Sequence, residues 1–258
     1  ALHNAAAELD KQDNQGNTPV HVAVHKGDEQ VLAALIKAGT KLNLKDSQGN
    51  TPVHLAICKG SQQLLVALIE AKAYLSVQNN RGATPAHYAA RDGQTQVITM
   101  LNNADANLSL QDNQGNTPAH LAAQKDDQQV LAALIQAGAD LSTQNKRGAT
   151  PAHYAARGGQ IQAIVLLHNA GADMNTKDKY GWTPTHLAVN YNYDQVLTAL
   201  IRAGTGLNIP NSECPTIAHY AAQEGHAQVI TALNESGVNL NKYSGRIAHL
   251  AVQNGHGQ

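Results

Sequence analysis

The hydrophobic residues of this chain fall in short blocks that polar turns separate. In the first clear block, Val31, Leu32, Leu35 and Ile36 recur at i, i+1, i+4 and i+5, which predicts a helix with one apolar face. Gly39 follows this block, and a glycine there can take the left-handed conformation that ends a helix. The pattern therefore predicts a short amphipathic helix that buries one side.

A shorter helix is predicted ahead of it. Thr18 can cap this helix, and Pro19 suits its first turn, where the backbone N–H groups have no helical partner. Gly27 can end it, and a polar turn at residues 13–16 leads into it. The turn, the first helix and the second helix then recur along the chain.

The repetition has a fixed period. The motif T-P-x-H returns every 33 residues, a seventh copy has Ile217 in place of Pro, and an eighth copy follows after 30 residues. The copies begin at Thr18, Thr51, Thr84, Thr117, Thr150, Thr183, Thr216 and Arg246. A longer period of 66 residues is visible in the segment RGATPAHYAAR, which stands at residues 81–91 and again at 147–157. Duplication of two-repeat blocks is the simplest origin of this longer period.

This pattern resembles the ankyrin repeat family. The family's T-P-L-H-x-A core and 33-residue period are matched by TPVHLA, TPAHYA and TPAHLA, over nearly the whole chain. The resemblance implies an all-α solenoid of stacked helix–turn–helix units with β-turn fingers.

We expect a single ankyrin-repeat array over residues 1–258. Its predicted parts are a half-repeat at 1–12, repeats at about 13–45, 46–78, 79–111, 112–144, 145–177, 178–210 and 211–240, and a truncated repeat at 241–258. The incomplete repeats at both ends suggest a piece of a longer protein.

Four residues depart from the consensus glycine that ends the helices of the other repeats. Lys72 and Asp105 stand where other repeats have the glycine that ends the second helix. Asp126 and Asn192 replace the glycine that ends the first helix. We expect all four to adopt the left-handed conformation, at a cost of about 1 kcal/mol for the lysine and less for the others.

The composition narrows the possible chemistry. The formal net charge is −1, so no strong overall field directs the chain to nucleic acid or to an anionic membrane. The polar surface comes instead from 23 Asn and 23 Gln residues, which suggests a neutral, amide-rich exterior. No apolar run approaches the ~20 residues that a membrane-spanning helix needs, so membrane insertion is not expected.

Histidine is abundant, but its spacing argues against metal binding. Eight of the 13 histidines belong to the T-P-x-H motif, one in each repeat. Stacked helices would hold them about 10 Å apart, too far to share one ion. In the ankyrin family this histidine links adjacent loops by hydrogen bonds. We find no metal, nucleotide or nucleophile motif, so we expect no catalytic site, no metal and no cofactor.

Two cysteines lie in distant repeats, Cys58 and Cys214, and free thiols are expected in a reducing compartment. The amide-rich, Phe-free composition resembles that of ankyrin-array proteins of intracellular bacteria. The free thiols favour a cytoplasmic protein, and this resemblance implies delivery into a host cell cytosol as a narrower hypothesis.

The ankyrin resemblance implies binding on the concave face, which comprises the turn tips and the ends of the first helices. In the sixth repeat these variable positions carry Tyr180, Trp182 and Tyr191, with Tyr193 close by. Large aromatic side chains are favoured anchors, so we expect a hot spot here. The alternative is local packing onto the diverged next repeat. The tyrosines that follow the motif histidine are expected in the core: Tyr88, Tyr154 and Tyr220.

Basic residues mark a second candidate surface. Arg81 and Arg91 end the first copy of the repeated eleven-residue segment, and Arg147 and Arg157 end the second. Each pair is expected on one face, where it could bind spaced carboxylates or phosphates of a partner. Three lysines extend this weakly basic stripe: Lys26, Lys59 and Lys125. The alternative is that these charges serve solubility, and the stripe is too sparse for nucleic acid.

Together these observations predict a monomeric, non-catalytic scaffold that binds a partner protein on its concave face. An alternative is the substrate-targeting arm of a larger enzyme or effector whose catalytic domain lies outside this chain. A third hypothesis is an autoinhibitory or homo-oligomeric surface.

Overall fold

The computed structural model describes residues 9–207, 209–210 and 216–237. Over these residues the chain forms helices and turns without any strand, so the prediction of an all-α fold is confirmed. The fourteen helices of the described residues are α1 (Pro19–Lys26), α2 (Glu29–Lys37), α3 (Pro52–Lys59), α4 (Gln62–Glu70), α5 (Pro85–Arg91), α6 (Thr95–Asn103), α7 (Pro118–Lys125), α8 (Gln128–Gln136), α9 (Pro151–Gly158), α10 (Ile161–Asn169), α11 (Pro184–Asn190), α12 (Asp194–Arg202), α13 (Ile217–Gln223) and α14 (Ala227–Glu235).

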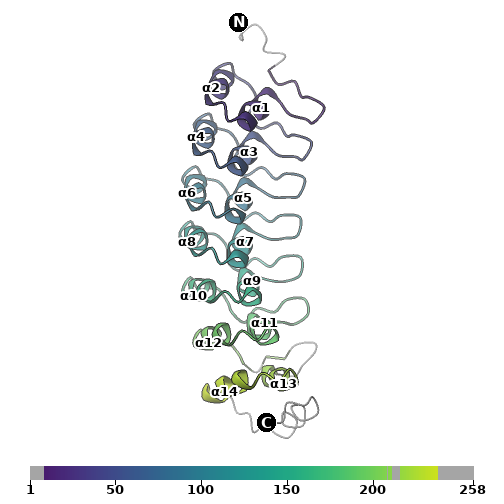
Figure 1. Cartoon of the computed structure of the whole chain (residues 1–258), viewed down its shortest axis with the longest axis vertical. Helices are drawn as coiled ribbons and strands as arrows, with labels where there is room; N and C mark the ends of the chain where they lie inside the picture. The colour runs from purple at the N-terminus through teal and green to yellow at the C-terminus, as the bar shows by residue number, and fades with distance from the viewer. Residues whose placement is uncertain (1–8, 208, 211–215, 238–258) are drawn as a thin grey trace. The chain divides into compact units, whose positions relative to one another are not determined.

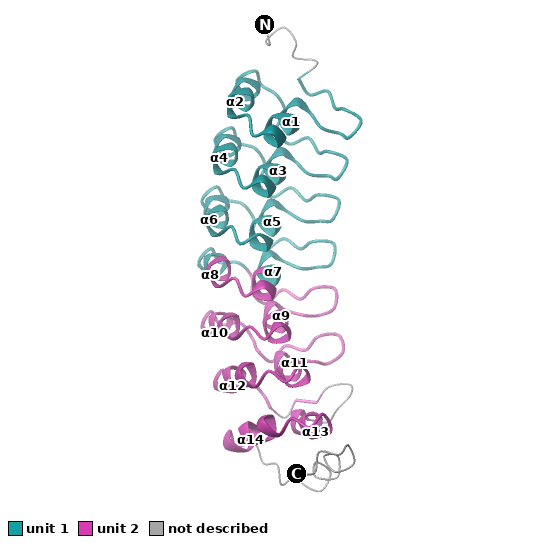
Figure 2. Ribbon diagram, in the orientation of Figure 1, with its two compact units in different colours: residues 1–121, 132–139 teal, residues 122–131, 140–258 magenta. Residues whose placement is uncertain are grey.

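The chain divides into two compact units (Figure 2). The first holds residues 1–121 and 132–139, and the second holds residues 122–131 and 140–258. The division runs through α7 and α8, inside one repeat, and not through a linker. The expectation of a single array over residues 1–258 stays a prediction.

Each first helix begins at a threonine cap. The side chain of Thr18 accepts a hydrogen bond from the backbone of His21, and the backbone N–H of Thr18 donates to the His21 ring. Pro19 occupies the first turn, where no backbone donor is needed. The same capping arrangement recurs at Thr51, Thr84, Thr150 and Thr183. The motif that sets the period is therefore the motif that starts the first helix.

Left-handed residues end the helices. Gly27 stops α1 with φ 77° and Gly159 stops α9 with φ 76°. The four predicted exceptions also have positive φ: Lys72 at 62°, Asp105 at 58°, Asp126 at 56° and Asn192 at 56°. The prediction that these four residues are left-handed is therefore confirmed. The repeat geometry imposes this conformation even where no glycine is present.

Within each unit, the helices pack in two layers beside a row of fingers (Figure 1). Neighbouring first helices contact one another, as α1 contacts α3 and α9 contacts α11. A first helix also contacts the second helix of its own repeat, as α1 contacts α2 and α11 contacts α12. Leu, Ile, Val and Ala fill the core, with side chains such as Leu32, Leu64 and Ile98 fully buried. Small side chains on the first helices let neighbouring repeats approach closely.

Several predictions concern residues beyond those described. The truncated repeat at 241–258, the eighth motif copy, Cys214 and most of the half-repeat at 1–12 lie outside the described residues.

Candidate protein-binding surface

Four motif histidines link their repeat to the next one. In these four, the ring Nε2 lies 2.9 to 3.1 Å from a backbone carbonyl oxygen of the following finger: His21 at Asn50, His54 at Ala83, His87 at Asn116 and His153 at Trp182. Because a threonine backbone N–H donates to Nδ1, the ring proton stands on Nε2 and points at the carbonyl. The predicted loop-linking role is confirmed.

Burial keeps these histidines neutral. It lowers the pKa of His54 to about 4, although the hydrogen bond to the Ala83 carbonyl opposes this shift. Burial also lowers the pKa of His21, His87 and His153. These rings serve the stability of the array and are not exposed for chemistry.

The finger tips are fixed by short-range hydrogen bonds. In the second finger, Asp46 Oδ1 accepts from the backbone N–H groups of Gln48 and Asn50, both at 2.8 Å. Successive tips are also joined through their backbones, as Ser47 N–H donates to the Gln15 carbonyl at 2.9 Å. The side chain just before each tip glycine is left exposed. These exposed tip residues are Gln15, Gln48, Arg81, Gln114, Arg147 and Tyr180.

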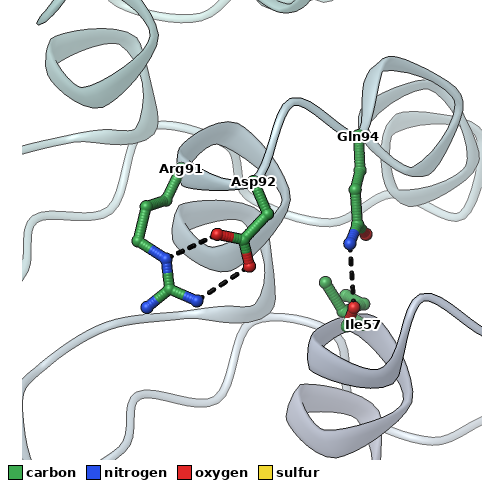
Figure 3. A network of polar contacts seen from close by, with 4 residues as sticks. All are labelled: Ile57, Arg91, Asp92 and Gln94. Atoms are coloured by element: carbon green, nitrogen blue, oxygen red, sulfur yellow. Dashed lines mark hydrogen bonds and ion pairs between the residues drawn. The ribbon is translucent and has the colours of Figure 1, made fainter. Parts of the chain in front are cut away.

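The first copy of the repeated segment carries a paired arginine (Figure 3). Arg91 donates from Nε and Nη2 to the two carboxylate oxygens of Asp92, both at 2.7 Å. The guanidinium carbon also lies 4.7 Å from the centre of the Tyr88 ring. The hydrogen bond to Asp92 raises the pKa of Arg91. Nearby, Gln94 Nε2 donates to the Ile57 carbonyl at 2.9 Å and ties this helix end to the preceding repeat.

The structure brings Arg81 and Arg91 to one hollow of the first unit. This hollow has a volume of about 360 Å³, and Tyr88, Asp112 and Gln114 also line it. Two carboxylates therefore accompany the two arginines. The sequence prediction did not anticipate that Asp92, the next residue along the chain, pairs with Arg91.

The remaining predicted basic residues are exposed. Arg147 lies at a finger tip and Arg157 lies near the end of α9. Lys26 and Lys125 end α1 and α7. Lys59 instead donates from Nζ to the His25 carbonyl at 2.8 Å, so it also holds two repeats together.

The aromatic cluster of the sixth repeat is only partly exposed. Tyr180, Tyr191 and Tyr193 expose 63%, 42% and 36% of their surface, and the rings of Tyr191 and Tyr193 stack with centres 6.1 Å apart. Trp182, however, is only 9% exposed. Its ring packs edge-to-face with the ring of Tyr220 in the next repeat, and the two ring centres lie 5.6 Å apart. The prediction of Trp182 as a surface anchor is therefore wrong. Its indole fills the space against the diverged seventh repeat.

The tyrosines that follow the motif histidine are half-buried and not in the core, so that expectation needs correction. The Tyr88 hydroxyl is bonded by Asn79 Nδ2 at 2.9 Å, and the Tyr154 hydroxyl by Asn145 Nδ2 at 3.1 Å. A signal in the sequence could have revealed this. All three tyrosine-bearing repeats have Asn nine residues before the tyrosine, where the leucine-bearing repeats have Asp, as at Asp46.

These features define a class of protein: an all-α protein of repeated helix pairs in which buried histidines join neighbouring repeats, and in which fingers present variable side chains. The sequence profile described as ankyrin repeats (3 copies) matches residues 1–79, 62–145 and 129–211. The chain therefore belongs to the ankyrin repeat family.

A solved structure shares the fold. The crystal structure of the ankyrin repeat domain of Bcl-3, described as a unique member of the IkappaB protein family, is similar with a TM-score of 0.78 and 24% sequence identity. The match covers 86% of this chain and 100% of that one. Among curated proteins, no match is found.

Two kinds of structural feature are absent from the described residues. No helix among them is long and apolar enough to cross a membrane. No group of three or more His, Cys, Asp or Glu side chains in the same part of the chain is arranged to hold a metal ion. Ankyrin repeats generally act as protein–protein interaction modules, and ankyrin repeat domains are typically non-catalytic.

Proposed function

We propose that this protein is a non-catalytic scaffold that binds a partner protein on its finger face. We define the finger face as the exposed side chains at the finger tips and at the ends of the first helices. It corresponds to the concave face that the family resemblance implies.

One observation carries the proposal. The buried positions of the motif repeat with little change, whereas the exposed position before each tip glycine carries Gln, Arg or Tyr. The tip backbone is held by the same hydrogen bonds in each case, as at Asp46 and at Asp178. A fixed backbone with chemically varied side chains suits recognition, because little conformational entropy is lost on binding.

The exposed tyrosines are the best candidates for anchors. Tyr180 and Tyr191 lie on the finger face of the sixth repeat, and each presents a large ring with a polar hydroxyl. Removal of one such anchor typically weakens binding by about 2 kcal/mol or more. Trp182 has no part in this proposal, because its side chain is buried.

A photo-crosslinking experiment tests the location of the binding face. A photoreactive amino acid is placed at Gln114, a finger tip, or at Val66, which is 40% exposed on α4. Both positions lie in the first unit. We expect the same partner from a cell lysate to crosslink at Gln114 and not at Val66. Crosslinking at Val66 alone would move the binding face to the second helices.

A second experiment tests the anchors. The Tyr180→Ala/Tyr191→Ala double variant is compared with Tyr74→Ala, which removes an equally exposed tyrosine from the loop after α4. We expect only the double variant to lose the captured partner, with unchanged circular dichroism in both. Equal retention by both variants would exclude the tyrosines as anchors.

A further inference from the structure

The two copies of RGATPAHYAAR differ in the residue that follows them. Asp92 follows the first copy, and Gly158 follows the second. We propose that the finger face of the fifth and sixth repeats is a docking surface for an acidic segment of a partner protein, and that the first copy is not. This inference rests on the proposed function, because it names the chemistry of the partner and the repeats that bind it.

In the first copy the arginine is already satisfied. Asp92 takes two hydrogen bonds from Arg91 at 2.7 Å, and Tyr88 lies under the guanidinium at 4.7 Å. A bidentate pair of this kind is the contact that a partner carboxylate would make. An acidic partner would have to displace Asp92, so the first copy gains little by binding one.

In the second copy the same arginines are available. Arg147 and Arg157 are exposed, and no side chain among the described residues forms an ion pair or hydrogen bond with either guanidinium. The residue after Arg157 has no side chain that could pair with it. A guanidinium that is free in the folded protein can give both donors of its fork to an incoming carboxylate.

The local charge also differs between the two copies. Around the second copy, four positions carry cations: Lys146, Arg147, Arg157 and Lys179. One position carries a carboxylate, Asp178, so the formal charge of this group is +3. Around the first copy, the equivalent positions carry Arg81, Arg91, Asp92 and Asp112, which gives a formal zero. The tips of the fifth and sixth fingers are adjacent, since Lys179 N–H donates to the Arg147 carbonyl at 2.9 Å. The cations of the two tips therefore lie together, and Arg157 holds the position that Arg91 has beside Arg81 in the hollow of the first copy. We call these four side chains the basic patch of the second unit.

The single carboxylate of this patch is engaged by the backbone. Asp178 Oδ1 accepts the N–H groups of Tyr180 and Trp182 at 2.9 and 2.8 Å. Its role is to shape the sixth fingertip, and no ion pair joins it to a cation among the described residues. The positive charges are consequently left for a ligand.

Exposed rings border the basic patch. A Cβ atom at Gly159, just after the end of α9, would lie 3.2 Å from the Tyr193 ring. Tyr193 therefore packs at the helix end that carries Arg157, and Tyr191 stacks on it. Tyr180 lies at the neighbouring tip with 63% of its surface exposed. Cations next to apolar rings suit a segment in which acidic and apolar side chains alternate.

Four cations spread over two repeats match a short acidic segment better than a nucleic acid. Affinity for nucleic acid depends on many phosphate contacts and calls for a dense basic surface. A peptide needs only two or three well-placed carboxylates, with the tyrosines supplying contact area. Electrostatic complementarity of this kind also makes binding sensitive to salt.

A charge placed at Gly158 provides the test. Gly158 ends α9 without a positive φ, and the three atoms nearest to a Cβ there would all belong to the flexible side chain of Gln160, the closest at 3.0 Å. Gly158→Asp would give Arg157 the partner that Arg91 has in the first copy. Gly158→Asn has the same shape without the charge and serves as the matched control.

The probe is a displayed library of random peptides of about twelve residues, selected on the full chain. We expect the selected peptides to be rich in Asp and Glu. Fluorescence anisotropy with a selected peptide should show an affinity loss of about tenfold for Gly158→Asp and for Arg157→Gln. Gly158→Asn and Arg91→Gln should change the affinity by less than about twofold.

The contrary outcomes separate the two proposals. Peptides that lose binding with Tyr180→Ala, but are not acidic or bind Gly158→Asp normally, would overturn the inference and leave the proposed function standing. A single-stranded RNA that binds with the same Gly158→Asp sensitivity, in place of acidic peptides, would overturn it in favour of nucleic acid. Selection of no peptide would overturn the inference, and the crosslinking result at Gln114 would then decide the proposed function alone.

Discussion

Two features of the finger tips require glycine: the left-handed backbone conformation and the close approach of the next finger. A pair of variants can separate their costs. Gly82 at the third tip and Gly60 at the end of α3 have the same φ of 71°. A Cβ atom at Gly82 would lie 2.6 Å from the backbone nitrogen of Asn113 in the next finger, whereas one at Gly60 would have nothing within 4 Å. Comparison of the two alanine variants therefore isolates the cost of close approach from the cost of the left-handed conformation.

The magnitudes follow from these contacts. The left-handed conformation costs alanine roughly 1–2 kcal/mol, and the loss of unfolded-state freedom returns about 0.4–1 kcal/mol. Gly60→Ala should therefore lower the free energy of unfolding by about 1 kcal/mol. Gly82→Ala adds about 1–3 kcal/mol of overlap and strains the 2.9 Å hydrogen bond from Asn113 N–H to the Arg81 carbonyl. A total near 3 kcal/mol is expected for Gly82→Ala.

Urea unfolding followed by far-ultraviolet circular dichroism measures both changes. Because each repeat contacts only its neighbours, the curves should be fitted with repeat and interface terms, with the Gly82→Ala loss appearing in the interface with the fourth repeat. Equal losses for the two variants would refute the reasoning, since they would mean that the close approach between fingers costs nothing.

Two further predictions concern buried rings. Trp182→Ala should lower the free energy of unfolding of the sixth and seventh repeats by about 3 kcal/mol, because the indole is buried against Tyr220; unfolding curves would check this, and an unchanged midpoint would contradict the burial. Stability should also fall with acidity. The pKa of His54 is lowered from 6.5 to about 4, so the unfolded chain binds more protons between these values. The contribution of neutral His54 to the free energy of unfolding is fully present above about pH 6.5 and decreases as the pH falls toward about 4. The total loss is at most about 3 kcal/mol. The stability gap between wild type and His54→Gln should therefore shrink from about pH 7 to about pH 4.5 in urea unfolding experiments, whereas a constant gap would exclude this linkage.

The sequence by itself determined the repeat and its local geometry. Local sequence determines three features: the 33-residue period, the threonine cap with Pro19, and the left-handed helix ends at positions such as Lys72. They could be predicted because each depends on residues within a few positions of one another. The buried role of the motif histidine also followed, from one histidine in each repeat and from the family resemblance.

The tertiary structure decided which candidate side chains reach the surface. Trp182 and Tyr180 stand two residues apart in one finger, yet one is 9% exposed and the other 63%. The difference depends on Tyr220, 38 residues further along, whose ring fills the other side of the interface with Trp182. The two identical eleven-residue segments likewise differ in whether their second arginine is paired. Asp92 accepts two hydrogen bonds from Arg91, whereas Gly158 has no side chain to pair with Arg157. Exposure and free charge depend on what the folded chain places next to each side chain, and the periodic pattern alone does not contain that information.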